Sequence, residues 1–256
     1  MVEQRLVFDQ VAELYDRVRP RYPEALVDDV VALSRIAAGG RILEIGSGTG
    51  LATEAFARRG FRILGLEPGT AMRAQGRARL ASFANVELAP FGLEDWPLEP
   101  AAFELVIAAQ SFHWVAPDVR FAKSAAALRK GGALAVFGNS PLDERTPLRA
   151  DLDRAYERHA PALLTPMGRG YSELTKVVQS FDESGCFGPV EVRTYPWSQA
   201  YTPAEYVDLL RTHSPHRMLP EAERAALHAA LRDAIECHGG LIEVSYQAEL
   251  YFAPRS

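Results

Sequence analysis

The chain has few of the residues that bind metals or form disulfides. Its 256 residues include two cysteines, Cys186 and Cys237, which are isolated in the sequence. Two such cysteines make neither a disulfide framework nor a zinc site. The six histidines lack metal-ligand spacing, and Pro215 separates His213 from His216. We therefore expect no metal site.

Long apolar runs and an excess of basic charge are also absent. No run approaches the ~20 residues that span a bilayer, and the amino terminus is charged from Glu3 and Arg5 onward, without an apolar signal core. The 28 basic residues are outnumbered by 33 acidic ones, which gives a formal net charge of −5. Because phosphate neutralisation supplies most nucleic-acid affinity, we expect no nucleic-acid partner. The lack of a long apolar run and of a signal core leads us to expect a cytoplasmic protein with no membrane partner.

The composition is that of a soluble globular protein, with 48% apolar and 24% charged residues. A chain of this length suits one α/β domain with a small elaboration. Apolar and amphipathic segments alternate up to residue 138, as in βαβ units of a parallel sheet. The predicted strands are the apolar start of 41–50, then 61–66, 85–88, 103–109 and 134–138, with helices over 24–38 and 51–59.

The pattern changes after residue 140. Helices are predicted over 142–160, 171–184, 203–212 and 220–238, with a loop over 163–171. Two late strands are predicted over 190–197 and 241–252. Two such strands suit an antiparallel hairpin at one edge of the sheet.

A glycine-dense turn follows the first predicted strand. Glu44, Gly46, Gly48 and Gly50 stand at every second position. Glycine is needed where φ is positive or where a ligand touches the backbone, and a ligand crevice lies at such a strand end in open α/β sheets. The dinucleotide motif G-x-G-x-x-G fails because Leu51 takes its third glycine position, and no P-loop motif is present. An ordinary tight strand–helix turn is the alternative.

Acidic residues follow the next two strands. Glu67 ends the second strand, where a carboxylate can accept both hydrogen bonds of a ribose diol; the alternative is an acid that suits the start of the next helix. Glu94 and Asp95 follow the third strand, beside Leu93 and Trp96.

Three motifs resemble those of class I S-adenosylmethionine-dependent methyltransferases. The turn E-x-G-x-G-x-G resembles motif I, and residues 15–23 resemble a "YDxxRPxYP" lead-in. Residues 110–115 look like an "hHW" signature of type 11-like methyltransferases near the trans-aconitate and ubiquinone/menaquinone branches. The resemblance covers roughly residues 10–140 and extends over the rest only in layout. It implies a Rossmann-like α/β fold, with a mostly parallel seven-stranded sheet in the order 3-2-1-4-5-7-6, strand 7 antiparallel, and a small helical cap.

The resemblance also implies S-adenosylmethionine as cofactor and S-adenosylhomocysteine as product. The glycine turn would lie against the methionine part, Glu44 would fix the loop and the amino group, and Glu67 would bind the ribose. Either Glu94 or Asp95 would meet the adenine amino group, and Leu93 or Trp96 could lie on the adenine ring. The predicted cofactor residues are Tyr15, Glu44, Gly46, Ser47, Gly48, Gly50, Glu67, Pro68, Met72, Glu94, Asp95 and Gln110.

His113 is the predicted catalytic residue, because it is the histidine beside the expected methyl position and could act as a base or an orienting group. A backbone-capping role is the alternative. The predicted substrate residues are Arg19, Tyr22, Trp114, His213 and His216. Arginine suits an anionic acceptor because its planar fork matches a carboxylate.

We expect a single methyltransferase domain over 1–256, with a lid over 1–23, a cofactor core over 24–140, and cap elements over 141–170 and 200–240. Methylation at oxygen of a small carboxylate or hydroxyl compound is the first hypothesis, by a monomer or homodimer. The alternatives are carbon methylation of an aromatic or quinone precursor and a non-catalytic S-adenosylmethionine-binding protein. A nicotinamide oxidoreductase is disfavoured by the broken glycine register. A nucleic-acid or protein methyltransferase is the remaining alternative, and the acidic charge balance disfavours the former.

Overall fold

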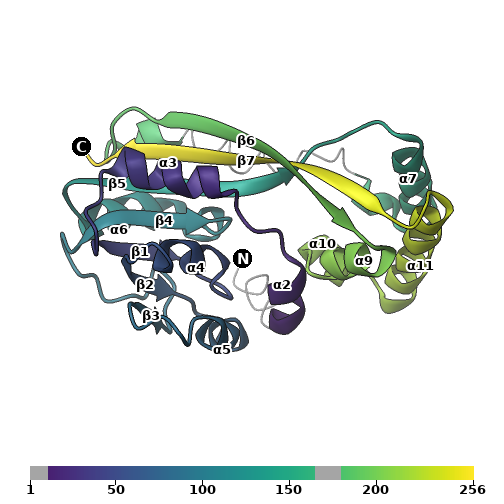
Figure 1. Ribbon diagram of the computed structural model, residues 1–256, viewed down its shortest axis with the longest axis horizontal. Helices are drawn as coiled ribbons and strands as arrows, with labels where there is room; N and C mark the ends of the chain where they lie inside the picture. Colours follow the sequence, from purple (N-terminus) through teal and green to yellow (C-terminus); the bar gives the residue numbers. More distant parts are fainter. Residues whose placement is uncertain (1–10, 165–179) are drawn as a thin grey trace.

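The computed structural model describes residues 11–164 and 180–256. Its centre is a seven-stranded sheet in the order β3-β2-β1-β4-β5-β7-β6, as the sequence predicted (Figure 1). Strands β1 to β5 pair in parallel, and β7 runs antiparallel to both β5 and β6. The strands are β1 Arg41–Ile45, β2 Arg62–Leu66, β3 Val86–Ala89, β4 Phe103–Ala109, β5 Leu128–Pro141, β6 Glu191–Tyr201 and β7 Ile242–Pro254.

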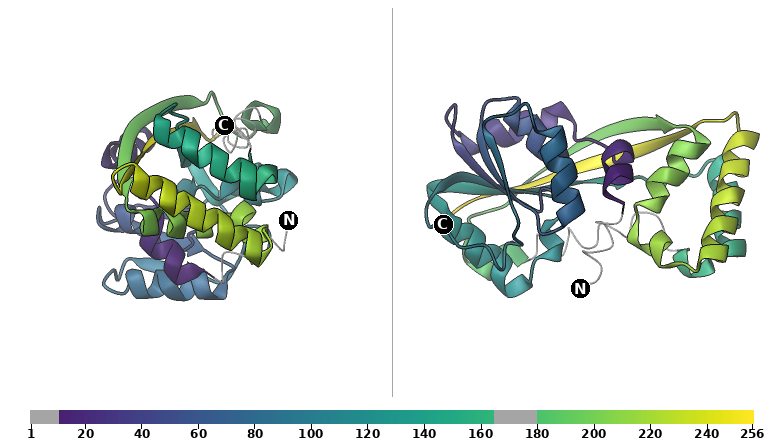
Figure 2. Two further views of the ribbon diagram at one scale, coloured as in Figure 1. Left: turned by 90° about the vertical axis from the view of Figure 1, so that its right-hand side faces the viewer. Right: turned by 90° about the horizontal axis from the view of Figure 1, so that it is seen from below.

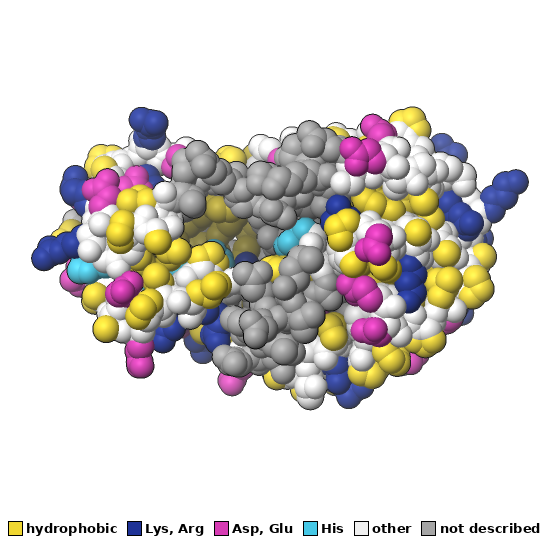
Figure 3. Space-filling view, turned by 180° about the vertical axis from the view of Figure 1, so that it is seen from behind, with side chains coloured by type: hydrophobic (Ala, Val, Ile, Leu, Met, Phe, Trp, Pro, Cys, Tyr) yellow, Lys and Arg dark blue, Asp and Glu magenta, His cyan; other side chains and the backbone are white. Residues whose placement is uncertain are grey.

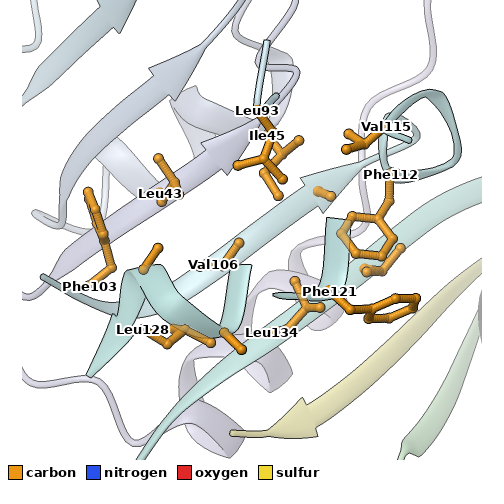
Figure 4. Close-up of a cluster of buried hydrophobic side chains, with 14 of the residues drawn as sticks. Leu43, Ile45, Leu93, Phe103, Val106, Phe112, Val115, Phe121, Leu128 and Leu134 are labelled. Atoms are coloured by element: carbon orange, nitrogen blue, oxygen red, sulfur yellow. The ribbon is translucent and has the colours of Figure 1, made fainter. Parts of the chain in front are cut away.

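The central strands are buried on both faces, which explains why they are almost wholly apolar. Successive side chains point to opposite faces of a strand, so Leu105 and Val106 of β4 enter different hydrophobic clusters. Helices α3 (Glu24–Ser34) and α4 (Leu51–Ala57) cover one face. Helix α6 (Pro117–Ala127) covers the other, where Phe112 and Phe121 pack edge to face at 5.2 Å (Figure 4).

The last three strands extend past the nucleotide-type core and carry a helical cap (Figures 1 and 2). The cap helices are α7 Pro147–His159, α9 Pro203–Arg211, α10 Ser214–Met218 and α11 Glu221–Cys237. They enclose a hydrophobic cluster of their own with the cap end of β7. A capping box at Thr202 and Glu205 begins α9, so its start is fixed by its own sequence. The predicted single domain with a cap stays a prediction.

Helix α2 (Ala12–Val18) lies between the core and the cap in both Figure 1 and the right panel of Figure 2. It packs against α5 (Thr70–Arg79) on one side and α9 on the other. Val18 belongs to the hydrophobic cluster of the cap. The lead-in segment therefore bridges the two parts of the molecule.

Some predicted boundaries differ from the structure. The predicted helix 24–38 ends at Ser34, because Arg35 takes a left-handed conformation with φ of 49°. The fifth strand begins at Leu128 instead of residue 134, and its register with β4 shifts between Leu128 and Ala133. Helices α2 and α10 are too short to be visible as periodic patterns. The predicted lid start, the loop over 163–171 and the helix over 171–184 fall partly outside the described residues.

No helix in the described ranges is long and apolar enough to cross a membrane.

Candidate functional site

The glycine turn adopts a conformation that other residues rarely take. The φ angles of Gly46, Gly48 and Gly50 are 68°, 57° and 83°. A Cβ on Gly46 would lie 2.6 Å from the Cβ of Ser111, so this position has no room for a side chain. A Cβ on Gly48 would meet only the Met72 methyl, at 3.4 Å. The turn is thus closely packed at Gly46 and more open at Gly48.

Glu67 holds this turn from the neighbouring strand. The Gly48 N–H donates to Glu67 Oε2 at 2.9 Å, and the Gly69 N–H donates to Oε1 at 2.7 Å. The side chain is 9% exposed, so the two bonds lie in a largely dry place. A carboxylate oxygen can accept more than one hydrogen bond. Glu67 can therefore brace the turn and still accept hydrogen bonds from a ligand diol.

Glu44 lies beneath the turn, at the end of β1. It is 1% exposed and accepts a hydrogen bond from the Thr53 hydroxyl at 2.6 Å. Burial raises the pKa of Glu44 to about 8, and the nearby negative charge of Glu67 adds to the effect, whereas the Thr53 bond opposes it. Near neutral pH the Glu44 carboxyl thus favours its proton, unless a cation comes close.

A small pocket opens beside the turn, at the carboxyl ends of β1 and β4. Its lining residues are Tyr15, Tyr22, Glu44, Gly46, Ser47, Gly48, Thr49, Leu51, Ala52 and Ala109. The hydroxyls of Ser47 and Thr49 are buried and make no hydrogen bond to any residue that the structure describes. Buried polar groups are normally hydrogen-bonded. The pocket therefore offers unused polar groups to a ligand.

The lead-in segment closes the pocket from the side of the cap. Tyr15 comes from α2, and the Tyr22 hydroxyl donates to Gln110 Oε1 at 3.4 Å. Arg19 stacks on the Tyr15 ring at 4.8 Å and donates to both the hydroxyl and the carbonyl of Thr212, at 2.8 and 2.9 Å. Arg19 thus connects the pocket wall to the end of α9.

Gln110 and the short helix η1 (Phe112–Trp114) continue the site beyond β4. Gln110 has a φ of 54°, and its amide donates to the Asn139 carbonyl at 3.2 Å. The His113 and Trp114 rings lie with centroids 4.8 Å apart. Figure 3 shows a hollow between the core and the cap, with hydrophobic side chains on its floor and a histidine at its rim.

The acids after β3 differ in their contacts. Glu94 accepts a hydrogen bond from the Ala116 N–H at 3.1 Å and so caps the start of α6, whereas Asp95 is exposed. Leu93 and Trp96 are buried in the cluster on that face of the sheet. Trp96 packs against Phe103 at 5.9 Å, which is core packing. The structure thus gives Glu94 a structural contact and leaves Asp95 open to solvent.

The two predicted histidines of the cap are not brought to the glycine turn. His216 is 5% exposed, and its ring nitrogens contact the Tyr156 hydroxyl at 3.1 Å and His228 Nε2 at 3.2 Å. Both nitrogens are therefore used inside the cap. His213 is half-buried, and burial and the nearby charge of Arg19 lower its pKa. Of the two, only His213 faces a residue of the lead-in segment.

Asn139 is a site residue that the sequence analysis missed. It is 3% exposed; its amide donates to the Arg21 carbonyl at 3.0 Å, and its Oδ1 accepts from Trp197 Nε1 at 3.0 Å. It thereby connects the lead-in segment, β5 and β6. No sequence signal marks it, because a polar residue near a strand end is usually exposed.

A second hollow lies within the cap, between α7, α9 and β7, and holds none of the predicted site residues. Among the described residues, no group of three or more His, Cys, Asp or Glu side chains could hold a metal.

A parallel sheet with one antiparallel strand, a glycine turn at the point where strand order reverses and an acid after β2 define a Rossmann-like protein with a nucleotide-type site. Residues 42–132 match the family model of a methyltransferase domain. Over this stretch, which runs from β1 into β5, the chain is therefore similar to a methyltransferase domain.

Two proteins named as methyltransferases are similar to this chain over most of its length. An uncharacterized methyltransferase of Mycobacterium tuberculosis is 26% identical over 237 residues, 92% of this chain and 88% of that protein. An uncharacterized methyltransferase-like protein of Schizosaccharomyces pombe is 27% identical over 225 residues, 85% of this chain and 81% of its own length.

Solved structures show the same fold. A protein described as a type II methyltransferase, from Anaeromyxobacter dehalogenans, matches with a TM-score of 0.63 and 24% identity over 92% of this chain and 97% of its own. A phosphoethanolamine N-methyltransferase of Haemonchus contortus, in complex with S-adenosylhomocysteine, matches with a TM-score of 0.54 and 16% identity over 96% of this chain and 57% of its own.

Proposed function

We propose that this protein transfers the methyl group of S-adenosylmethionine to an oxygen of a small-molecule acceptor, a carboxylate or a hydroxyl. The observation that carries the proposal is the pocket at the glycine turn. Its buried Ser47 and Thr49 hydroxyls lack partners among the described residues, and the Glu67 carboxylate lies beside them. These groups suit a ligand that has a diol, an amino group and a carboxylate.

The residues present fit S-adenosylmethionine. The Glu67 oxygens would accept from the ribose hydroxyls, and the buried Glu44 carboxylate would bind the ammonium of the methionine part, which would favour its ionised form. Gly48 lines the pocket and has no side chain, so a ligand can approach the backbone there. Bound there, S-adenosylmethionine would supply an activated methyl group on a sulfonium.

Because the methyl group arrives activated, the protein has mainly to orient the acceptor and exclude water. Tyr15 and Tyr22 line the pocket, and η1 follows shortly after Ala109 of β4, which also lines it. A carboxylate acceptor needs no proton removed, and His113 would then orient it. For a hydroxyl acceptor, His113 would take the proton as a general base. Arg19, in the lead-in segment, would favour an anionic acceptor.

The negative net charge of the chain favours a small acceptor over a nucleic acid. The experiment is a panel of carboxylic acids, phenols, amines and quinone precursors incubated with labelled S-adenosylmethionine. We expect labelled esters or ethers, and S-adenosylhomocysteine released in equal amount. Labelled amines or carbon-methylated products alone would contradict the choice of oxygen.

A variant separates the two roles of His113. In His113→Gln, kcat should fall by about a hundredfold or more if the histidine is a base, and by much less if it orients a carboxylate. Binding of S-adenosylhomocysteine should not change in either case. Unchanged kcat with every accepted substrate would remove His113 from the mechanism.

A further inference from the structure

Helix α2 is attached to the core by a buried ion-pair cluster. Arg79, the last residue of α5, contacts Asp16 Oδ1 of α2 at 2.8 Å and Glu54 Oε2 of α4 at 2.7 Å. The three side chains are only 13%, 17% and 11% exposed, in the order Arg79, Asp16 and Glu54. Arg58 and Arg21 also contact Glu54, so its charge is well compensated. Asp16 is the acidic residue that α2 contributes to this cluster.

The same arginine packs against the glycine turn. A Cβ placed on Gly50 would lie 3.6 Å from Arg79 Cδ and 2.7 Å from Leu80 Cδ1. Gly50 is the residue before α4, and its φ of 83° ends the turn. The aliphatic part of Arg79 therefore supports the turn, while its guanidinium holds α2.

Tyr15, the residue before Asp16, is part of the pocket wall. Any movement of α2 away from α5 would move this ring off the pocket. Thus, one side chain, Arg79, is in contact both with the turn that would hold the cofactor and with the helix that covers it.

We propose that the Asp16–Arg79 ion pair is a positioning device that fixes α2, and with it the Tyr15 ring, over the cofactor pocket. Neither residue touches the reacting atoms; each acts through Tyr15 and the turn. The inference rests on the proposed function, since the pocket is taken to bind S-adenosylmethionine. It predicts that loss of the pair speeds the release of the cofactor.

The other side of α2 supplies a matched control. Arg17 forms an ion pair with Asp208 of α9 at 2.9 Å, and its side chain is 66% exposed. Exposed ion pairs contribute little, because water screens them and two long side chains must be ordered. Arg17→Gln removes a charge from the same helix but leaves its attachment to the core intact.

The test is a double-mutant cycle read out by the binding of S-adenosylhomocysteine. The affinity and the dissociation rate are measured for the parent, Asp16→Asn, Arg79→Gln, the double variant, Asp16→Glu and Arg17→Gln. We expect Asp16→Asn and Arg79→Gln each to lose affinity about tenfold, mostly through faster release. The double variant should bind no more weakly than the weaker-binding of these two single variants. Asp16→Glu, which keeps the charge, should retain most of the affinity, and Arg17→Gln should match the parent.

Two controls keep the test specific. Thermal unfolding without ligand identifies a variant that fails to fold. If Arg79→Gln fails to fold, the comparison of Asp16→Asn with Asp16→Glu still tests the positioning role. If the parent binds and Asp16→Asn binds equally well, or if the two single effects add, the positioning role is overturned. If the parent itself does not bind, the proposed function fails, and this inference fails with it.

Discussion

At the residue scale, the turn combines groups that are unfavourable without a ligand. Glu44 is the clearest case, because its carboxyl is buried with one hydrogen bond, from Thr53. Its folded-state pKa of about 8 lies above its ordinary value. At low pH the Glu44 carboxyl is protonated in both the folded and the unfolded state, so it does not lower the stability. As pH rises from about 4.5 to 8, the unfolded chain ionises first, and the free energy of unfolding therefore falls over this range.

Glu44→Gln should therefore separate stability from binding. We expect the free energy of unfolding of the variant to exceed that of the parent by about 1 kcal/mol or more at pH 8, because the variant buries no carboxylate. Its affinity for S-adenosylhomocysteine should fall about tenfold, since the ligand ammonium loses its counter-ion. Denaturant unfolding and calorimetry measure the two effects. An unchanged affinity would show that Glu44 only packs beneath the turn.

The exposed acid Glu87 on β3 offers the matched control for that substitution. Glu87→Gln should change neither the stability at pH 8 nor the affinity.

Gly48 permits a second comparison at the same scale. Gly48 and Gly60 both have positive φ, but a Cβ on Gly60 would meet nothing within 4 Å. Alanine at either position should cost about 1 kcal/mol of stability, because both backbones are left-handed. Gly48→Ala should in addition weaken S-adenosylhomocysteine binding about tenfold or more, and Gly60→Ala should not. Equal affinities would mean that the ligand does not approach the turn at Gly48.

At the scale of elements, the strand order was predictable through the family resemblance, because the motifs that carry the resemblance are local. The turn after β1, the acid after β2 and the apolar β4 are each encoded in fewer than ten neighbouring residues. Helix α2 and the position of His216 were not predictable. Their structure depends on partners far along the chain, such as Arg79 and His228. The same holds for Asn139, which becomes buried only when three segments meet.

The histidine pair of the cap determines how α10 and α11 respond to acid. Burial lowers the pKa values of His216 and His228 to about 4. The nearby His228 lowers the pKa of His216 further. The charges of Arg211 and Arg224 lower the pKa of His228 further, whereas the charge of Asp208 raises it. Because the folded values lie below the ordinary value of 6.5, the unfolded chain binds protons first as pH falls. The stability that the neutral pair provides is therefore complete above about 6.5 and is lost towards pH 4.

We expect each histidine to lower the free energy of unfolding of the parent by about 3 kcal/mol over that window, since each unit of pKa shift corresponds to about 1.4 kcal/mol. His228→Gln keeps a hydrogen-bonding side chain but removes one titrating group, so its profile should be shallower. Chemical denaturation at pH 7 and pH 4.5 measures both. Parallel profiles for parent and variant would contradict this account of the cap.

At the scale of the whole molecule, a single sheet connects the cofactor core with the cap, and α2 connects them a second time. Figure 3 shows a hollow between these two parts of the molecule. A ligand that binds the folded protein only should therefore raise the stability of both parts together. At a concentration about a hundredfold above the dissociation constant, the gain is about 2.7 kcal/mol.

The measurement that tests this account most directly is a calorimetric titration of the protein with S-adenosylhomocysteine, repeated on Glu67→Ala and on Glu87→Ala. We predict micromolar binding by the parent and by Glu87→Ala. Glu67→Ala should bind much more weakly, because it loses both the ribose acceptor and the support of the Gly48 and Gly69 amides. No heat and no thermal shift in the parent, followed by tight binding of NADH, would contradict the account.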